Sequence, residues 1–201
     1  ASPCAQFRMS SCFVTGATGF VGLNLIEALL AEGWHVFALS RSGSPKQRLL
    51  LSMPRGPGKL EIVEGDISTC DAESFTLLVP QVDVIFHLIL LSESTSHHRR
   101  MPSGPGGFTP EGGAEHIRIN LAAMGAVVRA AIVKRVRRLV YCSSWSAYGL
   151  QHGIIDENTR STATEPVTLR LCDSMGGPIP YFVGKAACEA ALRAALTPAD
   201  G

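Results

Sequence analysis

The residues most suggestive of chemistry are a tyrosine and a lysine placed four positions apart. Tyr181 and Lys185 lie in an alanine-rich stretch typical of a helix, so both side chains are expected on one helix face, one turn apart. A nearby ammonium group favours the phenolate and lowers the pKa of a tyrosine from its usual value of about 10. The pair therefore predicts a general acid or base, although a helix can carry tyrosine and lysine at this spacing by chance.

A second hydrogen-bond donor is needed to hold a substrate oxygen near such a tyrosine. Ser143 and Ser144 directly follow the apolar run 139–142, which is typical of a strand. Either hydroxyl is a candidate donor if that strand ends beside a cofactor cleft. Two serines after a strand are also ordinary, so the catalytic interpretation depends on the other motifs.

Three evenly spaced glycines follow an apolar run near the start of the chain. Residues 12–14 predict a buried strand, Gly16, Gly19 and Gly22 predict a tight turn, and the apolar periodicity beyond them predicts a helix to about Glu32. Such a turn gathers backbone N–H groups at the positive end of a helix dipole and lets a pyrophosphate approach closely. The spacing differs from the common Gly-x-Gly-x-x-Gly fingerprint, yet strand, turn and helix together predict a dinucleotide site.

The end of the next predicted strand, 34–40, bears on the choice of dinucleotide. About 20 residues beyond the glycines, an acidic side chain accepts hydrogen bonds from the adenosine ribose, whereas an arginine suits a 2′-phosphate. Ser40 and Arg41 occupy this position, and no carboxylate is present there. We therefore expect NADP, with NAD as the alternative; an exposed loop arginine is the other explanation for Arg41.

Alternating strands and helices must position these groups. Further strands are predicted at 60–64, 82–88 and 139–142, and further helices at 71–79, about 115–132 and 181–196. This alternation predicts an α/β fold, a Rossmann-type doubly wound parallel β-sheet with helices on both faces. Segments 42–59, 92–114 and 150–180 are expected to be loops, the first with one helical turn.

Asp66 follows the third predicted strand, in Gly65-Asp66-Ile67. Ligands of open α/β sheets bind at the carboxyl ends of the strands, so Asp66 is a candidate ligand contact. An aspartate that caps the following helix is the alternative.

Composition excludes several classes of function. With 201 residues, 46% hydrophobic and 17% charged, the chain can form one globular domain, and its net charge of +1 gives no electrostatic case for nucleic acid.

Six cysteines without a Cys-x-x-Cys pair indicate reduced thiols in a cytoplasmic protein. His97, His98 and His116 lack metal-ligand spacing. The longest apolar run noted, 82–91, is far shorter than the roughly 20 residues of a membrane span, and residues 1–11 lack a signal-peptide core.

Together these motifs resemble the extended branch of the short-chain dehydrogenase/reductase family. The resemblance rests, in family order, on Thr15 to Gly22, Gly65-Asp66, Asn120, Ser143-Ser144 ahead of Tyr148-Gly149, and Tyr181-x-x-x-Lys185. It implies hydride transfer between a nicotinamide and a C–OH/C=O carbon of a small molecule. Ser144, Tyr181 and Lys185 are the implied catalytic residues, and Asn120 is a looser match to a proton-relay asparagine.

The resemblance also implies a set of cofactor-binding residues, with Asp66 at the adenine and Lys185 at the nicotinamide ribose. The set is Thr15, Gly16, Thr18, Gly19, Phe20, Val21, Gly22, Ser40, Arg41, Asp66, Ile67, His87 and Leu88, together with Tyr181 and Lys185.

Three functional hypotheses follow. Ser40-Arg41 favours NADP-using reductases of the dihydroflavonol or 3β-hydroxysteroid type, whereas Tyr148-Gly149 favours sugar-nucleotide epimerases and dehydratases. A non-catalytic, dinucleotide-binding regulator is the third. The presence of both catalytic motifs argues against it, and His87-Leu88-Ile89-Leu90, where relatives usually have His-Leu-Ala-Ala, argues for it.

The resemblance further implies a domain organisation and an assembly. We expect residues 1–201 to form one Rossmann domain that lacks the C-terminal region shaping the substrate pocket in relatives, and the interval from Ser144 to Tyr181 is longer than the family pattern. The helices of Asn120 and Tyr181 are candidates for a homodimer interface. Burial within one subunit explains their alanine content equally well.

Overall fold

The computed structural model describes residues 10–54, 56–91, 110–165 and 179–196. The chain groups into two compact units. The first comprises residues 1–89 and 129–142, and the second comprises residues 90–128 and 143–201. The first unit holds the sheet and the glycine turn, whereas the second holds the helix of Tyr181 and Lys185.

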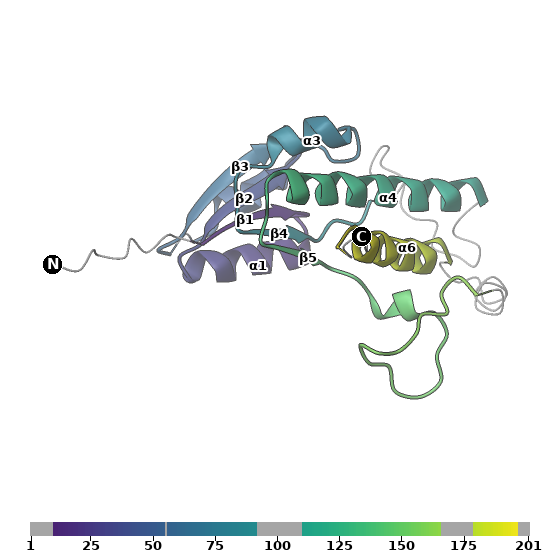
Figure 1. Ribbon diagram of the computed structural model, residues 1–201. Coiled ribbons are helices and arrows are strands. Elements are labelled where there is room, and N and C mark those ends of the chain that lie inside the picture. Colours follow the sequence, from purple (N-terminus) through teal and green to yellow (C-terminus); the bar gives the residue numbers. More distant parts are fainter. Residues whose placement is uncertain (1–9, 55, 92–109, 166–178, 197–201) are drawn as a thin grey trace. The chain divides into compact units, whose positions relative to one another are not determined.

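A five-stranded parallel sheet forms the centre of the first unit (Figure 1). Its strands are β1 (Ser11–Thr15), β2 (His35–Ser40), β3 (Lys59–Glu64), β4 (Val84–His87) and β5 (Arg138–Tyr141). They lie in the order β3-β2-β1-β4-β5, and every pairing is parallel. These are the first five strands of the doubly wound order 3-2-1-4-5-6, so the predicted Rossmann-type fold is confirmed.

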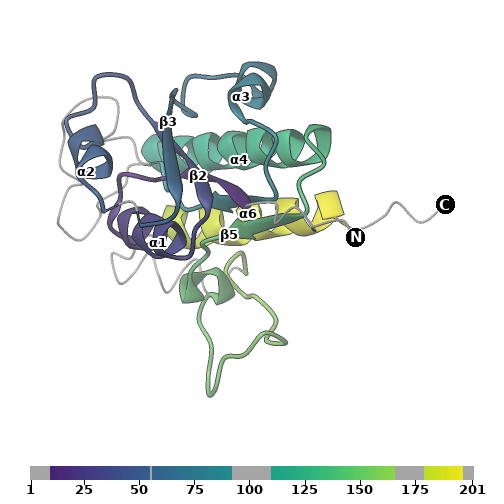
Figure 2. The same ribbon diagram turned by 90° about the vertical axis from the view of Figure 1, so that its left-hand side faces the viewer.

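Helices cover both faces of this sheet because successive side chains of β1 point to opposite faces. Cys12 and Val14 are fully buried with Ile26 and Leu30 of α1 (Phe20–Ala31) in one core cluster. Phe13 points the other way and meets the ring of Phe75 in α3 (Ala72–Leu78), with centroids 6.1 Å apart. Figures 1 and 2 show α1 and α3 on opposite sides of the strands.

The ends of these helices have clear local causes. After α1, Gly33 adopts φ +80°, and the N–H of Trp34 bonds to the carbonyl of Leu29 at 2.9 Å, which turns the chain into β2. At the start of α3, the carboxylate of Asp71 accepts a hydrogen bond from the N–H of Ser74 at 2.7 Å. Asp71 therefore caps this helix, and the alternative of a capping role for Asp66 is wrong. The single helical turn expected within 42–59 is α2 (Gln47–Leu51).

Two helices and a 3-10 turn make up the regular structure described in the second unit. They are α4 (Pro110–Val133), whose last residues enter the first unit, η2 (Trp145–Tyr148) and α6 (Ile179–Leu196). The two helices lie side by side in Figures 1 and 2. A Cβ on Gly184 of α6 would lie 3.6 Å from Cδ2 of His116 in α4, which is an ordinary packing distance.

The helix α4 begins five residues earlier than its sequence pattern indicates. Pro110 to Ala114 was expected to be loop because of its two glycines, but these residues are helical, so that part of the prediction is wrong. Proline at a helix start explains the boundary. The remainder of the expected loop, 92–109, lies outside the described residues, as does 166–178 of the second expected loop.

One stretch of α4 is long and apolar enough to cross a membrane by length and composition alone. It runs from Ala114 to Val133 with a mean hydropathy of 1.4, and is the one such stretch in the described part of the chain. Core helices pass the same test, and Met124 and Val127 in this stretch are fully buried in protein. Its composition is therefore weak evidence for a membrane span.

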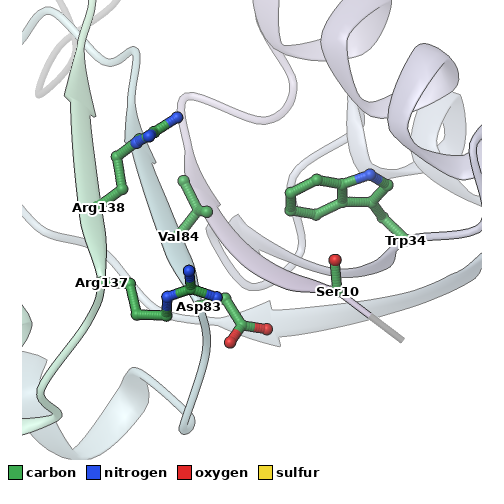
Figure 3. Close-up of a pocket in the computed structure, with 6 residues that line it drawn as sticks. All are labelled: Ser10, Trp34, Asp83, Val84, Arg137 and Arg138. Atoms are coloured by element: carbon green, nitrogen blue, oxygen red, sulfur yellow. The ribbon is translucent and has the colours of Figure 1, made fainter. Parts of the chain in front are cut away.

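A hollow of about 370 Å³ lies at the amino-terminal edge of the sheet (Figure 3). It is lined by Ser10, Trp34, Asp83, Val84, Arg137 and Arg138. The carboxylate of Asp83 accepts hydrogen bonds from the N–H and the hydroxyl of Ser11, at 3.0 and 2.9 Å. Ligands of open α/β sheets bind at the opposite, carboxyl end of the strands, so this hollow is not the cofactor site.

Candidate functional site

The turn between β1 and α1 leaves little room for a side chain at its glycine positions. Gly16 adopts φ +72°, and a Cβ there would lie 2.9 Å from the backbone nitrogen of Ile89. A Cβ on Gly22 would lie 2.2 Å from the carbonyl oxygen of Gly16, and one on Gly19 would lie 3.2 Å from the same atom. The N–H of Gly19 closes the turn by bonding to that oxygen at 3.0 Å. The turn at the end of β1 therefore requires glycine at positions 16 and 22.

The amino terminus of α1 opens from this turn. Gly19 is its N-cap, and no side chain of the described residues caps it; its first turn also carries no acidic residue. Phe20 and Val21 are exposed, at 85% and 53%. Backbone N–H groups at an uncapped helix terminus attract an anion such as a phosphate, and Thr18 stands beside them.

Thr15 and His87 support the turn from within the sheet. The hydroxyl of Thr15 and Nδ1 of His87 are 2.8 Å apart, and both side chains are buried. The His87 ring stacks on Tyr141 at a centroid distance of 5.6 Å. These side chains therefore hold β1, β4 and β5 together, and Leu88 and Ile89 continue from β4 with their backbone against Gly16. Ile89 and Leu90 are bulkier than the two alanines usual in relatives, but the backbone at Ile89 still lies close to Gly16.

The tip of β2 presents Arg41 at the same edge of the sheet as the glycine turn, because β1 and β2 are parallel neighbours. Ser40 is buried, and its carbonyl accepts a hydrogen bond from the N–H of Gly65 at 3.0 Å. Arg41 is exposed directly after it, and its carbonyl accepts from the N–H of Ser44. Hydrogen bonds to the carbonyls of Ser40 and Arg41 thus hold the backbone that carries the Arg41 side chain.

Asp66 lies just beyond β3 in a defined orientation. Its Oδ1 accepts hydrogen bonds from the N–H of Ser68 at 2.9 Å and from the Ser68 hydroxyl at 2.6 Å. Ile67 next to it is buried at 4% exposure and anchors the segment. The sheet therefore carries Arg41 and Asp66 on neighbouring strands at its carboxyl edge.

The second unit carries the residues expected to be catalytic. Ser144 is the N-cap of η2, and its Oγ accepts hydrogen bonds from the N–H and the hydroxyl of Ser146, at 3.3 and 2.9 Å. Because Ser144 Oγ is the acceptor in both bonds, its own proton can be donated to another oxygen. On α6, Nζ of Lys185 lies 6.0 Å from the centre of the Tyr181 ring, and Lys185 is only 4% exposed.

A further polar contact on α6 involves Glu189, which no sequence motif singles out. Glu189 Oε1 accepts a hydrogen bond from the hydroxyl of Ser143, and Glu189 Oε2 pairs with Arg193 at 3.1 Å. The available signal was the spacing: Tyr181, Lys185, Glu189 and Arg193 recur every four residues, on one side of the helix. This contact attaches the segment of Ser143 and Ser144 to the helix of Tyr181 and Lys185.

Asn120 is a backbone clamp in this structure. Its Nδ2 donates to the carbonyls of Leu91 and His116, both at 2.8 Å, and its Oδ1 accepts from the N–H of Leu91 at 3.0 Å. Its side-chain amide therefore holds the chain after β4 on α4. His116, one turn earlier, is fully buried, and burial together with the nearby charge of Lys185 lowers its pKa below the usual range.

Metal and disulfide chemistry receive no support from the described part of the chain. No group of three His, Cys, Asp or Glu in the described residues has metal-binding geometry, and His97 and His98 lie outside those residues. Among the described residues, Cys12, Cys70, Cys142 and Cys188 are not joined by disulfides. Burial raises the pKa of Cys12 to about 12. Cys4 and Cys172 lie outside the described residues.

Several known enzymes are similar to this chain in sequence. The 3β-hydroxysteroid dehydrogenase/Δ5→4-isomerase of Mycobacterium tuberculosis is 32% identical over 137 residues, which cover 68% of this chain and 32% of the enzyme. Dihydroflavonol 4-reductase of Arabidopsis thaliana is 27% identical over 184 residues, 89% of this chain and 43% of the enzyme. The chain thus spans less than half the length of these curated relatives.

Solved structures show the same fold. The Bordetella bronchiseptica enzyme WbmH in complex with NAD+ matches with a TM-score of 0.66 at 21% identity, covering 94% of this chain and 54% of WbmH. Vestitone reductase from alfalfa matches with a TM-score of 0.65 at 24% identity, covering 92% and 51%. The sequence model described as "NAD dependent epimerase/dehydratase family" matches residues 12–170, more than half of the chain. The chain therefore belongs to the NAD-dependent epimerase/dehydratase family.

Proposed function

We propose that this chain is the cofactor-binding part of an NADP-dependent oxidoreductase acting at a C–OH/C=O carbon of a small molecule, of the 3β-hydroxysteroid or dihydroflavonol type. The glycine turn carries the proposal. A Cβ at Gly16 or Gly22 would clash with neighbouring backbone, so the chain can turn this tightly only with glycine there, at the carboxyl end of β1. There the strand order reverses, between the neighbouring strands β1 and β4, which is where open α/β sheets bind dinucleotides.

The residues of the first unit fit each part of such a cofactor. The backbone N–H groups at the start of α1 would hold the pyrophosphate. Asp66 would accept a hydrogen bond from the adenine amino group, and Arg41 would pair with a 2′-phosphate. The preference for NADP over NAD rests on Arg41 alone, because β2 ends without a carboxylate.

A bound nicotinamide supplies or accepts the hydride, and the protein supplies proton transfer and orientation. Tyr181 would move the proton at the substrate oxygen, and Nζ of Lys185 lies 6.0 Å from the centre of its ring. The Ser144 hydroxyl, held by Ser146, would donate a hydrogen bond to the same oxygen. Asn120 would act indirectly, because its hydrogen bonds hold the backbone of Leu91 against α4.

Direct titration with NADPH and NADH tests the cofactor preference. A charge-assisted hydrogen bond contributes about 1.5–3 kcal/mol, so Arg41→Ala should weaken NADPH binding by at least about tenfold. NADH binding should change by less than about twofold. Arg137→Ala is the matched control, because it removes an exposed arginine at the opposite edge of the sheet. Equal affinity of the unaltered protein for both cofactors would contradict the NADP assignment.

Two alternative functions have specific support. Tyr148-Gly149 and the UDP-glucose 4-epimerase of Mycolicibacterium smegmatis, 33% identical over 138 residues, favour a sugar-nucleotide epimerase. The bulky Ile89 and Leu90, where relatives usually have two alanines, favour a cofactor-binding regulator without activity. A carbonyl-substrate screen with Tyr181→Phe as control separates these. Turnover that Tyr181→Phe abolishes supports an enzyme, and NADPH binding without turnover supports the regulator.

A further inference from the structure

Two large aromatic residues directly follow Ser144 and Tyr181, two of the residues proposed to be catalytic. Trp145 comes after Ser144 at the start of η2, and Phe182 comes after Tyr181 on α6. The Trp145 and Phe182 rings are 6.2 Å apart at an interplanar angle of 59°, and the Phe182 and Tyr181 rings are 6.4 Å apart at 67°. Three aromatic rings therefore form a continuous series within the second unit.

The local structure holds Trp145 outward. Ser144 caps η2 through Ser146, and Ser146 and Ala147 are buried at 2% and 3% exposure. Trp145 precedes these buried positions and is 70% exposed, whereas Phe182 is half-buried. Since η2 packs on α6, the indole is fixed at one end of the ring series while its surface stays accessible.

Among the described residues, the serines that flank Trp145 make hydrogen bonds within the protein. Ser146 donates to Ser144, and Ser143 donates to Glu189. A sugar nucleotide needs many hydrogen-bond partners, because each polar group buried without one costs free energy. Flat apolar ligands need broad ring surfaces, which exposed aromatic side chains supply with little loss of conformational entropy.

We propose that Trp145 and Phe182 bind the flat apolar ring system of the substrate and thereby select a steroid-like or flavonoid-like molecule over a sugar nucleotide. This proposal rests on the proposed oxidoreductase function. The two rings are specificity-determining residues. Ser144 and Tyr181, which immediately precede them in the chain, act on the oxygen of the reacting carbon.

Tryptophan fluorescence provides a direct test, because the sequence has only two tryptophans, Trp34 and Trp145. In a Trp34→Phe background, emission reports on Trp145 alone. The probes are androstenedione, a planar ketosteroid, and UDP-glucose, each titrated in the presence of NADP+. Androstenedione should change the emission saturably, and equilibrium dialysis should give the same Kd. UDP-glucose should cause no saturable change.

Variants assign the binding to the rings. Trp145→Ala and Phe182→Ala should each weaken androstenedione binding by about tenfold or more, as measured by dialysis, and Trp145→Phe should restore most of it. Leu77→Ala is the matched control, since Leu77 is equally exposed, at 79%, on α3 of the other unit. NADPH binding, measured on the same samples, should be unchanged in all four variants.

Three results would overturn the proposal. The first is saturable binding of UDP-glucose, but not androstenedione, at Trp145. The second is binding of neither probe. The third is a Trp145 emission that shifts with protein concentration in the absence of ligand, which would make the rings a contact between copies of the chain. If the unaltered protein does not bind NADPH, the proposed function fails. This outcome differs from the three results above, which overturn only the proposal for Trp145 and Phe182.

Discussion

At the scale of single residues, the hydrogen bond between Ser143 and Glu189 determines where Ser144 sits with respect to α6. Glu189 is one turn beyond Lys185, and Ser143 is the neighbour of Ser144. Neither residue contacts the reacting atoms in the proposed mechanism. Their role is to hold the serine segment and the tyrosine helix in a constant arrangement.

A double-mutant cycle measures the strength of this hydrogen bond. Ser143→Ala and Glu189→Ala are made singly and together, and the free energy of unfolding is measured in urea. Hydrogen bonds to charged groups contribute about 1.5–3 kcal/mol, and Glu189 is 26% exposed, so we expect a coupling energy of about 1–2 kcal/mol. Arg193→Gln, which removes the exposed ion pair with Glu189, should cost about 0.3–0.5 kcal/mol. Additive single-mutant effects would contradict the role of the contact.

At the scale of elements, two glycines in helices have opposite expected responses to alanine. In Gly22→Ala the new Cβ would meet the Gly16 carbonyl at 2.2 Å, and backbone must move to relieve the clash. We expect a loss of about 1–3 kcal/mol of stability and no NADPH binding. Gly125 of α4 is exposed and has nothing within 4 Å of its Cβ position.

Gly125→Ala should therefore stabilise the protein by about 0.5–1 kcal/mol and leave NADPH binding unchanged, because alanine is the better helix former. Thermal unfolding and NADPH titration of both variants check the pair of predictions. Normal NADPH binding by Gly22→Ala would show that the turn tolerates a side chain, and would remove the observation on which the cofactor site rests.

The packing of α4 against α6 predicts a pH dependence of stability. Burial, and then the charge of Lys185, lowers the pKa of His116 below its usual value of about 6.5. Below that pH the unfolded chain binds a proton that the native protein does not, so stability should fall as the pH falls, by at most about 1.4 kcal/mol per pH unit. His116→Gln should remove this component between pH 7 and 5. His152→Gln, at an exposed position, should retain it.

At the scale of the whole molecule, cofactor binding should appear as added thermal stability. A ligand at 100 times its Kd stabilises the native state by about 2.7 kcal/mol. For a chain of this size, that corresponds to a Tm increase of about 5–10 °C. NADPH should produce this shift in differential scanning fluorimetry. Gly22→Ala should show none, and an unaltered protein whose Tm does not respond to NADPH would contradict the proposed function.

Much of the first unit follows from local sequence patterns. The apolar run 12–14, the glycines and the apolar periodicity of α1 each imply one element, and alternating elements leave few topologies for a parallel sheet. Helix starts were harder to predict. Asp66 and Asp71 are equally good caps by residue type. Gly112 and Gly113 are poor helix formers, so the sequence does not indicate that α4 begins before them. Only the observed backbone distinguishes a cap from a turn aspartate.

The sequence by itself determined the fold class, the glycine turn, the end of β2 at Arg41 and the pairing of Tyr181 with Lys185, because each depends on residues close together in the chain. Tertiary structure alone decided that Thr15 bonds to His87, that Asn120 clamps Leu91, that Ser143 bonds to Glu189 and that His116 is buried beside α6. Each of these contacts joins residues 29 to 72 positions apart or depends on packing between helices. Local periodicity carries no information about such partners, because the fold brings them together only after the elements have formed.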